Sequence, residues 1–149
     1  MPLAFTRQVS PRIAECALTH LNRQSIDPDR AAAQHGDYER ALTDAGYTIV
    51  RLPYLADDPD AVFVEDTAIL LGEHAIITRP GAASRADETT TTAEGLDPYF
   101  TIHHLAAGAI DGGDVLRIDN RLYVGQSSRS DTAPGDQPAV RCHRPGRPV

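Results

Sequence analysis

The sequence predicts a mixed α/β fold that contains hairpins as well as helices. The elements are expected in the order strand, helices, paired strands, helix, strands. Several predicted strands follow one another with only a few Gly, Pro or Asp residues between them, which is typical of hairpins and not of a simple doubly wound sheet. At 149 residues the chain is long enough for one ordinary domain and short for two.

The first 46 residues are expected to form one strand and two helices. Residues 3–6 read as a short strand, and Ser10 followed by proline supplies a cap for a helix over 13–21. Asp27, again followed by proline, caps a second helix, which Gly46 ends. This second helix is predicted to be amphipathic because apolar residues recur in it at helical spacing. The recurring residues are Tyr38, Ala41, Leu42 and Ala45.

Seven later runs are predicted to be strands because they are rich in β-branched and aliphatic residues and are bounded by Gly, Pro or Asp. They are 47–52, 61–64, 67–71, 74–79, 99–105, 114–118 and 121–125. The segment SRADETTTTAEGLD lies between the fourth and the fifth of them and is predicted to be a helix. Ser84 and the following acids can cap it, although four consecutive threonines lower its helix propensity.

The composition changes from about residue 132. The last eighteen residues, 132–149, hold four prolines and three arginines and show no helical or strand periodicity. We therefore expect residues 1–131 to form one structural unit and residues 132–149 to be a tail outside it. We interpret the chain as truncated, with an unrelated reading frame at its end; a flexible native tail is the alternative.

The charge balance argues against nucleic acid as a partner. The chain has 21 acidic and 14 basic residues, a formal net charge of -7, whereas a phosphate backbone needs a clustered basic surface. Its N-terminus lacks the apolar core of a signal peptide, and no apolar run approaches the roughly 20 residues that span a bilayer. Cys16 and Cys142 are too few for a disulfide framework. We expect a cytoplasmic protein without a membrane partner.

Two adjacent acids, Glu65 and Asp66, interrupt an apolar stretch, so at least one of them is expected to face the buried side. A buried carboxylate is costly unless it meets an arginine, a metal or a cationic ligand. Three arginines near turns and strand ends, Arg79, Arg85 and Arg129, can bind a carboxylate bidentately. Together these residues predict a pocket for a small zwitterion with a cationic tail, which is the shape of an arginine-like molecule.

Four motifs in order, FVEDTA, ITRPGAASR, IDGGDVL and VGQSSRS, resemble the N-terminal part of dimethylarginine dimethylaminohydrolases, the dimethylargininases of the amidinotransferase superfamily. The resemblance runs from about residue 3 to about residue 131. It implies the α/β propeller of the penteins, five ββαβ-type modules around a pseudo-fivefold axis, of which this chain would form roughly the first half. The implied reaction hydrolyses N-methylated arginine to citrulline and a methylamine through a cysteine thiolate, with no cofactor and no metal.

The resemblance also implies roles for single residues. The substrate-binding positions are Leu18, Asp60, Glu65, Asp66, Arg85 and Arg129. Among these, Asp66 would hydrogen-bond the guanidinium, the two arginines would contact the amino-acid end of the substrate, and the backbone of Leu18 would meet the ligand. Asp111 would orient the catalytic histidine, and Arg79 would be structural.

The histidine and the nucleophilic cysteine of that family lie in its C-terminal half, beyond the match. Cys142 and His143 are adjacent in the unmatched tail and are not expected to replace them. Cys16 is expected to be a buried small hydrophobe on a helix, and His74 a surface residue without a partner. We therefore predict that this chain alone hydrolyses nothing and that its open propeller edges can self-associate.

Two alternatives stay open. Arginine deiminases and amidinotransferases share the pentein fold and the guanidinium-binding carboxylates, so the substrate can be arginine itself. In a different class, the chain can be a non-catalytic module that binds guanidinium or pairs with another chain to complete its propeller. Binding of arginine analogues without turnover would favour that second alternative.

Overall fold

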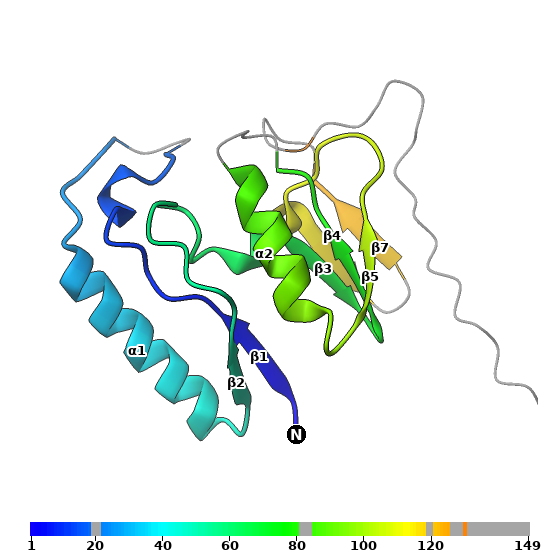
Figure 1. Cartoon of the computed structure of the whole chain (residues 1–149), viewed down its shortest axis with the longest axis horizontal. Helices are drawn as coiled ribbons and strands as arrows, with labels where there is room; N and C mark the ends of the chain where they lie inside the picture. Colours follow the sequence, from blue (N-terminus) through cyan, green and yellow to red (C-terminus); the bar gives the residue numbers. More distant parts are fainter. Residues whose placement is uncertain (19–21, 81–84, 119–120, 126–129, 131–149) are drawn as a thin grey trace, which may run out of the picture.

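The computed structural model describes residues 1–18, 22–80, 85–118, 121–125 and 130. A first unit consists of β1 (Leu3–Thr6), α1 (Pro28–Asp44) and β2 (Thr48–Arg51), with the two strands parallel. A second unit consists of β3 (Ala68–Leu71), β4 (His74–Ile77), α2 (Ala86–Leu96) and β5 (Thr101–His104). The hairpin of β6 (Val115–Ile118) and β7 (Arg121–Val124) follows. Figure 1 shows these units along the chain.

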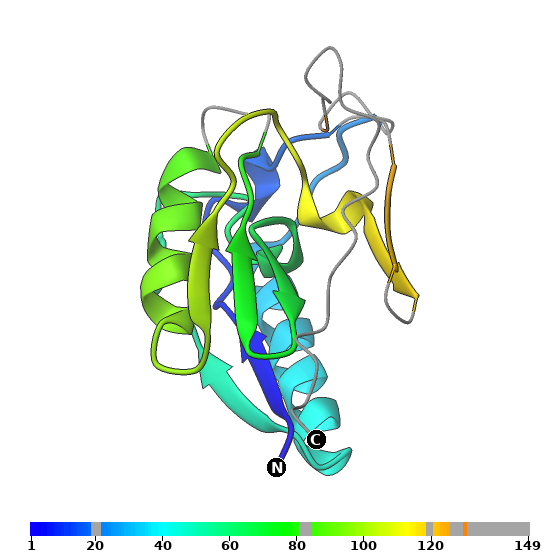
Figure 2. The same ribbon diagram turned by 90° about the vertical axis from the view of Figure 1, so that its right-hand side faces the viewer.

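The second unit has the element order ββαβ. Strands β3 and β4 are antiparallel, and β4 and β5 are parallel neighbours joined through α2. In Figure 2, α2 covers one face of this sheet and the β6–β7 hairpin lies on the other side. The first unit is a βαβ arrangement and the third a ββ hairpin, so the order of elements confirms the predicted mixed α/β fold, and the second unit has the complete order of the expected ββαβ module.

The core of the second unit is small and aliphatic. Ala75, Ile77 and Leu96 are buried at the centre. Phe5 of β1 packs against this cluster, with its ring centroid 5.4 Å from that of Tyr99 and 5.8 Å from that of Phe100. The aromatic contacts therefore attach the first unit to the second.

Helix α1 forms as the sequence predicts. The Asp27 side chain accepts hydrogen bonds from the backbone N–H groups of Asp29 and Arg30 at 3.0 and 3.2 Å, and Gly46 ends the turn that follows with a φ of +90°. The predicted buried face was wrong, because Tyr38 is exposed and the residue that α1 buries is Glu39. The helix packs on the strands through polar groups: Thr6 Oγ1 donates to Glu39 at 2.7 Å.

The predicted helix over 13–21 was wrong. Only Ile13–Glu15 form a single 3₁₀ turn, after which the described chain has no helix or strand through residue 18. The guanidinium of Arg23 donates to the carbonyls of Ala14 and Cys16, while the Ala17 N–H donates to the Asp60 carboxylate. Side-chain partners, from Arg23 nearby and from Asp60 at long range, thus take the backbone groups that helical bonds would use. Cys16 is buried as expected, but it lies outside any helix.

The predicted strand over 61–64 was also wrong. The segment makes successive tight turns, in which the N–H groups of Ala61 and Phe63 donate to the carbonyls of Asp58 and Asp60. A 3₁₀ turn, η2 (Val64–Asp66), follows directly. Two buried guanidinium groups replace the missing strand partner: Arg7 donates to the Ala61 carbonyl and Arg85 to the Phe63 carbonyl.

Three further expectations concern the rest of the chain. His74 was wrongly expected to lack a partner, since its Nδ1 lies 3.1 Å from Nε2 of His103 on the neighbouring strand. Across the described ranges, no helix combines the length and the apolar character needed to cross a membrane. The expected tail, 132–149, lies outside the described residues, as do Cys142 and His143.

Candidate functional site

The predicted site residues that the structure describes gather around η2. Asp60 precedes this turn, Glu65 and Asp66 belong to it, and Arg85 lies against it just before α2. A second 3₁₀ turn, η4 (Gly112–Asp114), packs against η2 and begins directly after Asp111. Segments that are distant in the sequence therefore meet at one place. Arg129 lies outside the described residues.

Asp66 is the buried carboxylate that the sequence predicts. It is 8% exposed, whereas its neighbour Glu65 is exposed. Its backbone is fixed to the end of β4, because Oγ1 of Thr78, the residue after that strand, donates to the Asp66 carbonyl at 2.7 Å. Its carboxylate accepts a hydrogen bond from Arg85, Nη1 to Oδ2, at 2.7 Å. Asp66 thus holds a guanidinium group within the chain itself.

Arg85 is surrounded by acceptors. Its Nε and Nη2 donate to the Glu88 carboxylate, the shortest distance being 2.7 Å from Nη2 to Oε2. Nη2 also donates to the carbonyls of Phe63 and Asp60, at 3.2 and 3.4 Å. Burial by itself would lower the pKa of Arg85, but the hydrogen bonds to Glu88 and Asp66 outweigh it and raise that pKa above its ordinary value. The expected contact of Arg85 with a substrate carboxylate stays a prediction.

The Leu18 segment reaches the site through Asp60. Both carboxylate oxygens of Asp60 lie 3.1 Å from the backbone nitrogen of Ala17, which donates to them. Leu18, the next residue, is 39% exposed. Its backbone therefore lies beside one of the predicted substrate-binding acids, and its side chain stays accessible.

Asp111 joins the site through two glycines. Its Oδ1 accepts a hydrogen bond from the Gly113 N–H at 3.1 Å, and its own N–H donates to Ser130 Oγ at 3.1 Å. A Cβ atom on Gly112 would lie 2.1 Å from the Glu65 carbonyl oxygen, and one on Gly113 would lie 2.6 Å from Asp66 Oδ1. The Gly-Gly pair therefore lets two loops touch at the predicted acids, which is more than the simple turn that the sequence indicates.

Two functional candidates were not predicted from the sequence. Glu88 is 1% exposed on α2 and binds Arg85, and Arg7 is 0% exposed behind it. Arg7 Nη2 donates to Glu88 O, Thr91 Oγ1 and Thr92 Oγ1, at 3.4, 3.1 and 2.9 Å. The spacing of Arg85 and Glu88, three residues apart at the start of a helix, was a usable signal. Nothing local in the sequence indicates the burial of Arg7.

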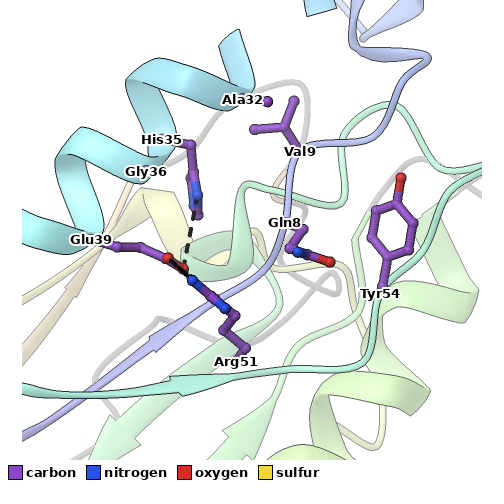
Figure 3. Close-up of a pocket in the computed structure, with 8 residues that line it drawn as sticks. All are labelled: Gln8, Val9, Ala32, His35, Gly36, Glu39, Arg51 and Tyr54. Atoms are coloured by element: carbon purple, nitrogen blue, oxygen red, sulfur yellow. Dashed lines mark hydrogen bonds and ion pairs between the residues drawn. The ribbon is translucent and has the colours of Figure 1, made fainter. Parts of the chain in front are cut away.

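A separate hollow of about 320 Å³ lies between α1 and the β1–β2 pair, away from η2. Figure 3 shows Glu39 and His35 from α1 and Arg51 from β2 converging in it. Arg51 Nη2 donates to Glu39 at 2.6 Å, and His35 Nδ1 lies 3.9 Å from the same carboxylate. Because Glu39 already has Thr6 and Arg51 as partners, this hollow offers no available carboxylate to a cation.

The Glu39 contacts predict a pH dependence of stability. The hydrogen bonds from Arg51 lower the pKa of Glu39 below its ordinary value of 4.5, in spite of its burial. The stabilisation is thus present above pH 4.5 and is lost as the pH falls through the lowered pKa. We expect Glu39→Gln to be less stable than the wild type at neutral pH and the difference to shrink in acid. Urea unfolding at several pH values measures this, with Glu94→Gln on the exposed side of α2 as control. A difference that stays constant from neutral pH into acid would contradict it.

Comparisons with known proteins agree with this geometry. The N(G),N(G)-dimethylarginine dimethylaminohydrolase of Streptomyces coelicolor is 38% identical over 132 residues, which are 87% of this chain and 51% of that protein. The protein of the same name from Pseudomonas aeruginosa is 35% identical over 116 residues, 76% of this chain and 45% of its own length. No protein-family model matches the chain. The chain spans about half the length of the curated relatives it matches.

Solved structures give the same result. Dimethylarginine dimethylaminohydrolase from Pseudomonas aeruginosa complexed with citrulline matches with a TM-score of 0.79 and 32% identity, over 85% of this chain and 51% of that one. The N-terminal domain of a cyanobacterial arginine dihydrolase matches with a TM-score of 0.71 over 85% of this chain and 49% of its own. At 20% identity, that second likeness shows the fold alone.

The arrangement of units and these matches show that the chain has the mixed α/β fold of pentein propeller-type enzymes and covers about half of such a chain. Within that class the chain is similar to dimethylarginine dimethylaminohydrolases and corresponds to their N-terminal part.

Proposed function

We propose that the cluster around η2 is the guanidinium-binding part of a dimethylargininase-type site and that it takes a small guanidino amino acid. The observation that carries this proposal is the buried Asp66 carboxylate, which contacts the Arg85 guanidinium at 2.7 Å. Asp60 and Glu65 flank it and add negative charge. The matched enzymes are named for dimethylarginine, and one of them was solved with citrulline bound, which supports this class of ligand.

The proposed reaction of the whole site is hydrolysis of methylated arginine. The guanidinium carbon resists attack because its positive charge is delocalised, so the carboxylates hold the group while a cysteine thiolate adds to that carbon. The C–N bond then breaks, the methylamine leaves with a proton, and water releases citrulline from the thioether-linked intermediate. Asp111, 2% exposed and fixed by Gly113 and Ser130, is proposed to orient the histidine that moves these protons.

The described residues support binding better than turnover. Cys16 is the one cysteine within them, and at 5% exposure its thiol is closed off from a ligand at η2. We therefore propose that this chain by itself binds the guanidino amino acid without hydrolysing it. Self-association through open sheet edges and a cytoplasmic location stay predictions.

Titration calorimetry with L-arginine tests the proposed binding. We expect the chain to bind L-arginine and Asp66→Asn to weaken that binding about tenfold or more, since a hydrogen bond to a charged group contributes about 1.5–3 kcal/mol. Asp44→Asn, at the exposed end of α1, serves as the control and should bind as the wild type does.

Two results would overturn parts of this proposal. Absence of binding in the wild type, or equal binding by Asp66→Asn, would remove the guanidinium site. Citrulline formed from methylarginine by the purified chain, and lost in Cys142→Ser, would show that the chain has its own nucleophile.

A further inference from the structure

A second buried carboxylate lies behind the proposed site. Glu88, on the first turn of α2, is 1% exposed and contacts Arg85 through both of its oxygens. The distances are 3.1 and 3.0 Å from Nε and 2.7 Å from Nη2. Asp66 contacts the same guanidinium from another side, through Nη1. One guanidinium is thus shared by two carboxylates, and Glu88 makes more of the contacts.

This sharing decides how much negative charge Asp66 presents. The two carboxylates carry one negative charge more than Arg85 supplies, and the buried Arg7, which acts electrostatically on Glu88, offsets part of it. Glu88 therefore balances positive charge that would otherwise be left beside Asp66. Without Glu88, Asp66 would be the one carboxylate that pairs with Arg85 among the described residues, and the pair would be neutral. A neutral pair attracts a second guanidinium much less than a charged group does.

Arg7 does not compete with Arg85 for hydrogen bonds to the Glu88 carboxylate. Its Nη2 donates to the backbone carbonyl of Glu88 and to the hydroxyls of Thr91 and Thr92, and its Nη1 donates to the Ala61 carbonyl. These acceptors are neutral, so the Glu88 carboxylate keeps its hydrogen bonds with Arg85, although the positive charge of Arg7 also acts on it. Burial raises the pKa of Glu88, and the hydrogen bonds from Arg85 oppose this rise.

We propose that Glu88 is a positioning residue. Its negative charge balances the positive charge of Arg85, so that Arg85 does not neutralise the Asp66 carboxylate, which can then attract the guanidinium of the ligand. This inference rests on the proposed function of the η2 cluster. It predicts that Glu88 affects the binding of a cationic ligand and not that of a neutral ligand of the same shape.

L-Arginine and L-citrulline form the required pair of probes, because they share the amino-acid end and differ in having a guanidinium or a neutral ureido group. We expect Glu88→Gln to weaken L-arginine binding about tenfold and L-citrulline binding at most about twofold, as measured by calorimetry. Glu88→Asp keeps the negative charge and should therefore restore the wild-type ratio of L-arginine affinity to L-citrulline affinity. Glu94→Gln, exposed on the same helix, should leave both affinities unchanged. An equal loss for both ligands, or no loss for either, would overturn the proposal.

A double variant keeps the test valid if Glu88→Gln does not fold. Arg85→Met combined with Glu88→Gln removes both charges, which a buried site tolerates better than removal of one. One positive and one negative charge are removed together, so the net charge beside Asp66 stays as in the wild type. The ratio of L-arginine to L-citrulline affinity should therefore stay within about twofold of the wild type, even where both affinities fall. A tenfold drop in this ratio would overturn the role assigned to Glu88.

A measurement without ligand separates this inference from the proposed function. If the wild type binds neither probe, the binding proposal fails, and the titration of the Asp66 carboxyl carbon by NMR still tests Glu88. In the Glu88→Gln variant the Glu88 charge no longer offsets that of Arg85, so Arg85 favours the ionised form of Asp66 more strongly and the midpoint of this titration should move to lower pH than in the wild type. An unchanged or higher midpoint would overturn the inference.

Discussion

Gly112→Ala is expected to lower the free energy of unfolding by about 1–3 kcal/mol, towards the upper end of that range. The added Cβ would lie 2.1 Å from the Glu65 carbonyl oxygen and 3.2 Å from the Asp66 carbonyl carbon, and no real Cβ tolerates the first of these distances. The obstacle is backbone, so relief requires η2 and η4 to move apart. The strain is steric, because Gly112 does not have a positive φ. Urea unfolding measures the loss.

The matched control is Gly36→Ala. Gly36 lies inside α1, where a Cβ would meet nothing within 4 Å, so alanine should raise the stability by about 0.5–1 kcal/mol through its higher helix propensity. Gly113→Ala gives an intermediate case, because its Cβ would meet a side-chain oxygen, Asp66 Oδ1, at 2.6 Å. Equal stability of the wild type and the Gly112 variant would show that η2 and η4 are not in tight contact.

Local signals in the sequence predict much of the fold. The Asp27 cap and the Gly46 stop place α1 correctly, and six of the seven strand runs after residue 46 become β2 to β7. These elements are determined by hydrogen bonds between near neighbours or by regular ladders, which composition and periodicity reflect. The ββαβ order of the second unit follows from the same signals.

The errors share one physical cause. The residues 13–21 and 61–64 have ordinary helix and strand patterns, yet their carbonyls accept hydrogen bonds from Arg23, Arg7 and Arg85. Arg7 is 54 residues from Ala61, and Arg85 is 22 residues from Phe63. Arg23 is only nine residues from Ala14 and seven from Cys16, so distance along the chain explains the error at 61–64 alone. The local sequence pattern does not reflect hydrogen-bond donors as distant as Arg7 and Arg85. The same holds for Glu39, which α1 buries because Thr6 and Arg51 meet it there.

The site could be predicted as a set of residues but not as a network. The acids at 60, 65 and 66 stand out in the sequence, and the apolar stretch predicts that at least one of Glu65 and Asp66 is buried, without saying which. Arg85 forms hydrogen bonds with both Asp66 and Glu88 because α2 is positioned against η2 in the folded chain, which the sequence does not show. Pairing within the folded chain therefore decides which charges a ligand meets.

Arg85→Met is expected to have the largest effect on stability. Arg85 is 7% exposed and is the shared partner of two buried carboxylates, so its loss removes the ion pair that each of them, Glu88 and Asp66, makes with it. Removal of one member of a buried ion pair costs about 3–5 kcal/mol, a large part of the stability of an ordinary domain. Urea or thermal unfolding at neutral pH should show this loss or an unfolded chain.

A double-mutant cycle separates charge from packing in this effect. Adding Glu88→Gln to Arg85→Met removes the most deeply buried unpaired charge, so the double variant should be clearly more stable than Arg85→Met alone. If the second substitution brings no recovery, the contribution of Arg85 is contact area and hydrogen bonding to the Phe63 carbonyl, and not the pairing of charges.

The pH dependence of Arg85→Met supplies an independent check. Burial raises the pKa of Glu88 above its ordinary value of 4.5, and removal of Arg85 takes away the hydrogen bonds that oppose this rise. A group whose pKa is raised in the folded state favours folding when it is protonated, and this contribution is lost as the pH rises through the raised pKa. The free energy of unfolding of Arg85→Met should therefore fall furthest below that of the wild type near neutral pH, and this difference should shrink as the pH falls towards 4.5. A deficit of the same size at both pH values would mean that Glu88 is not ionised in the folded wild-type chain.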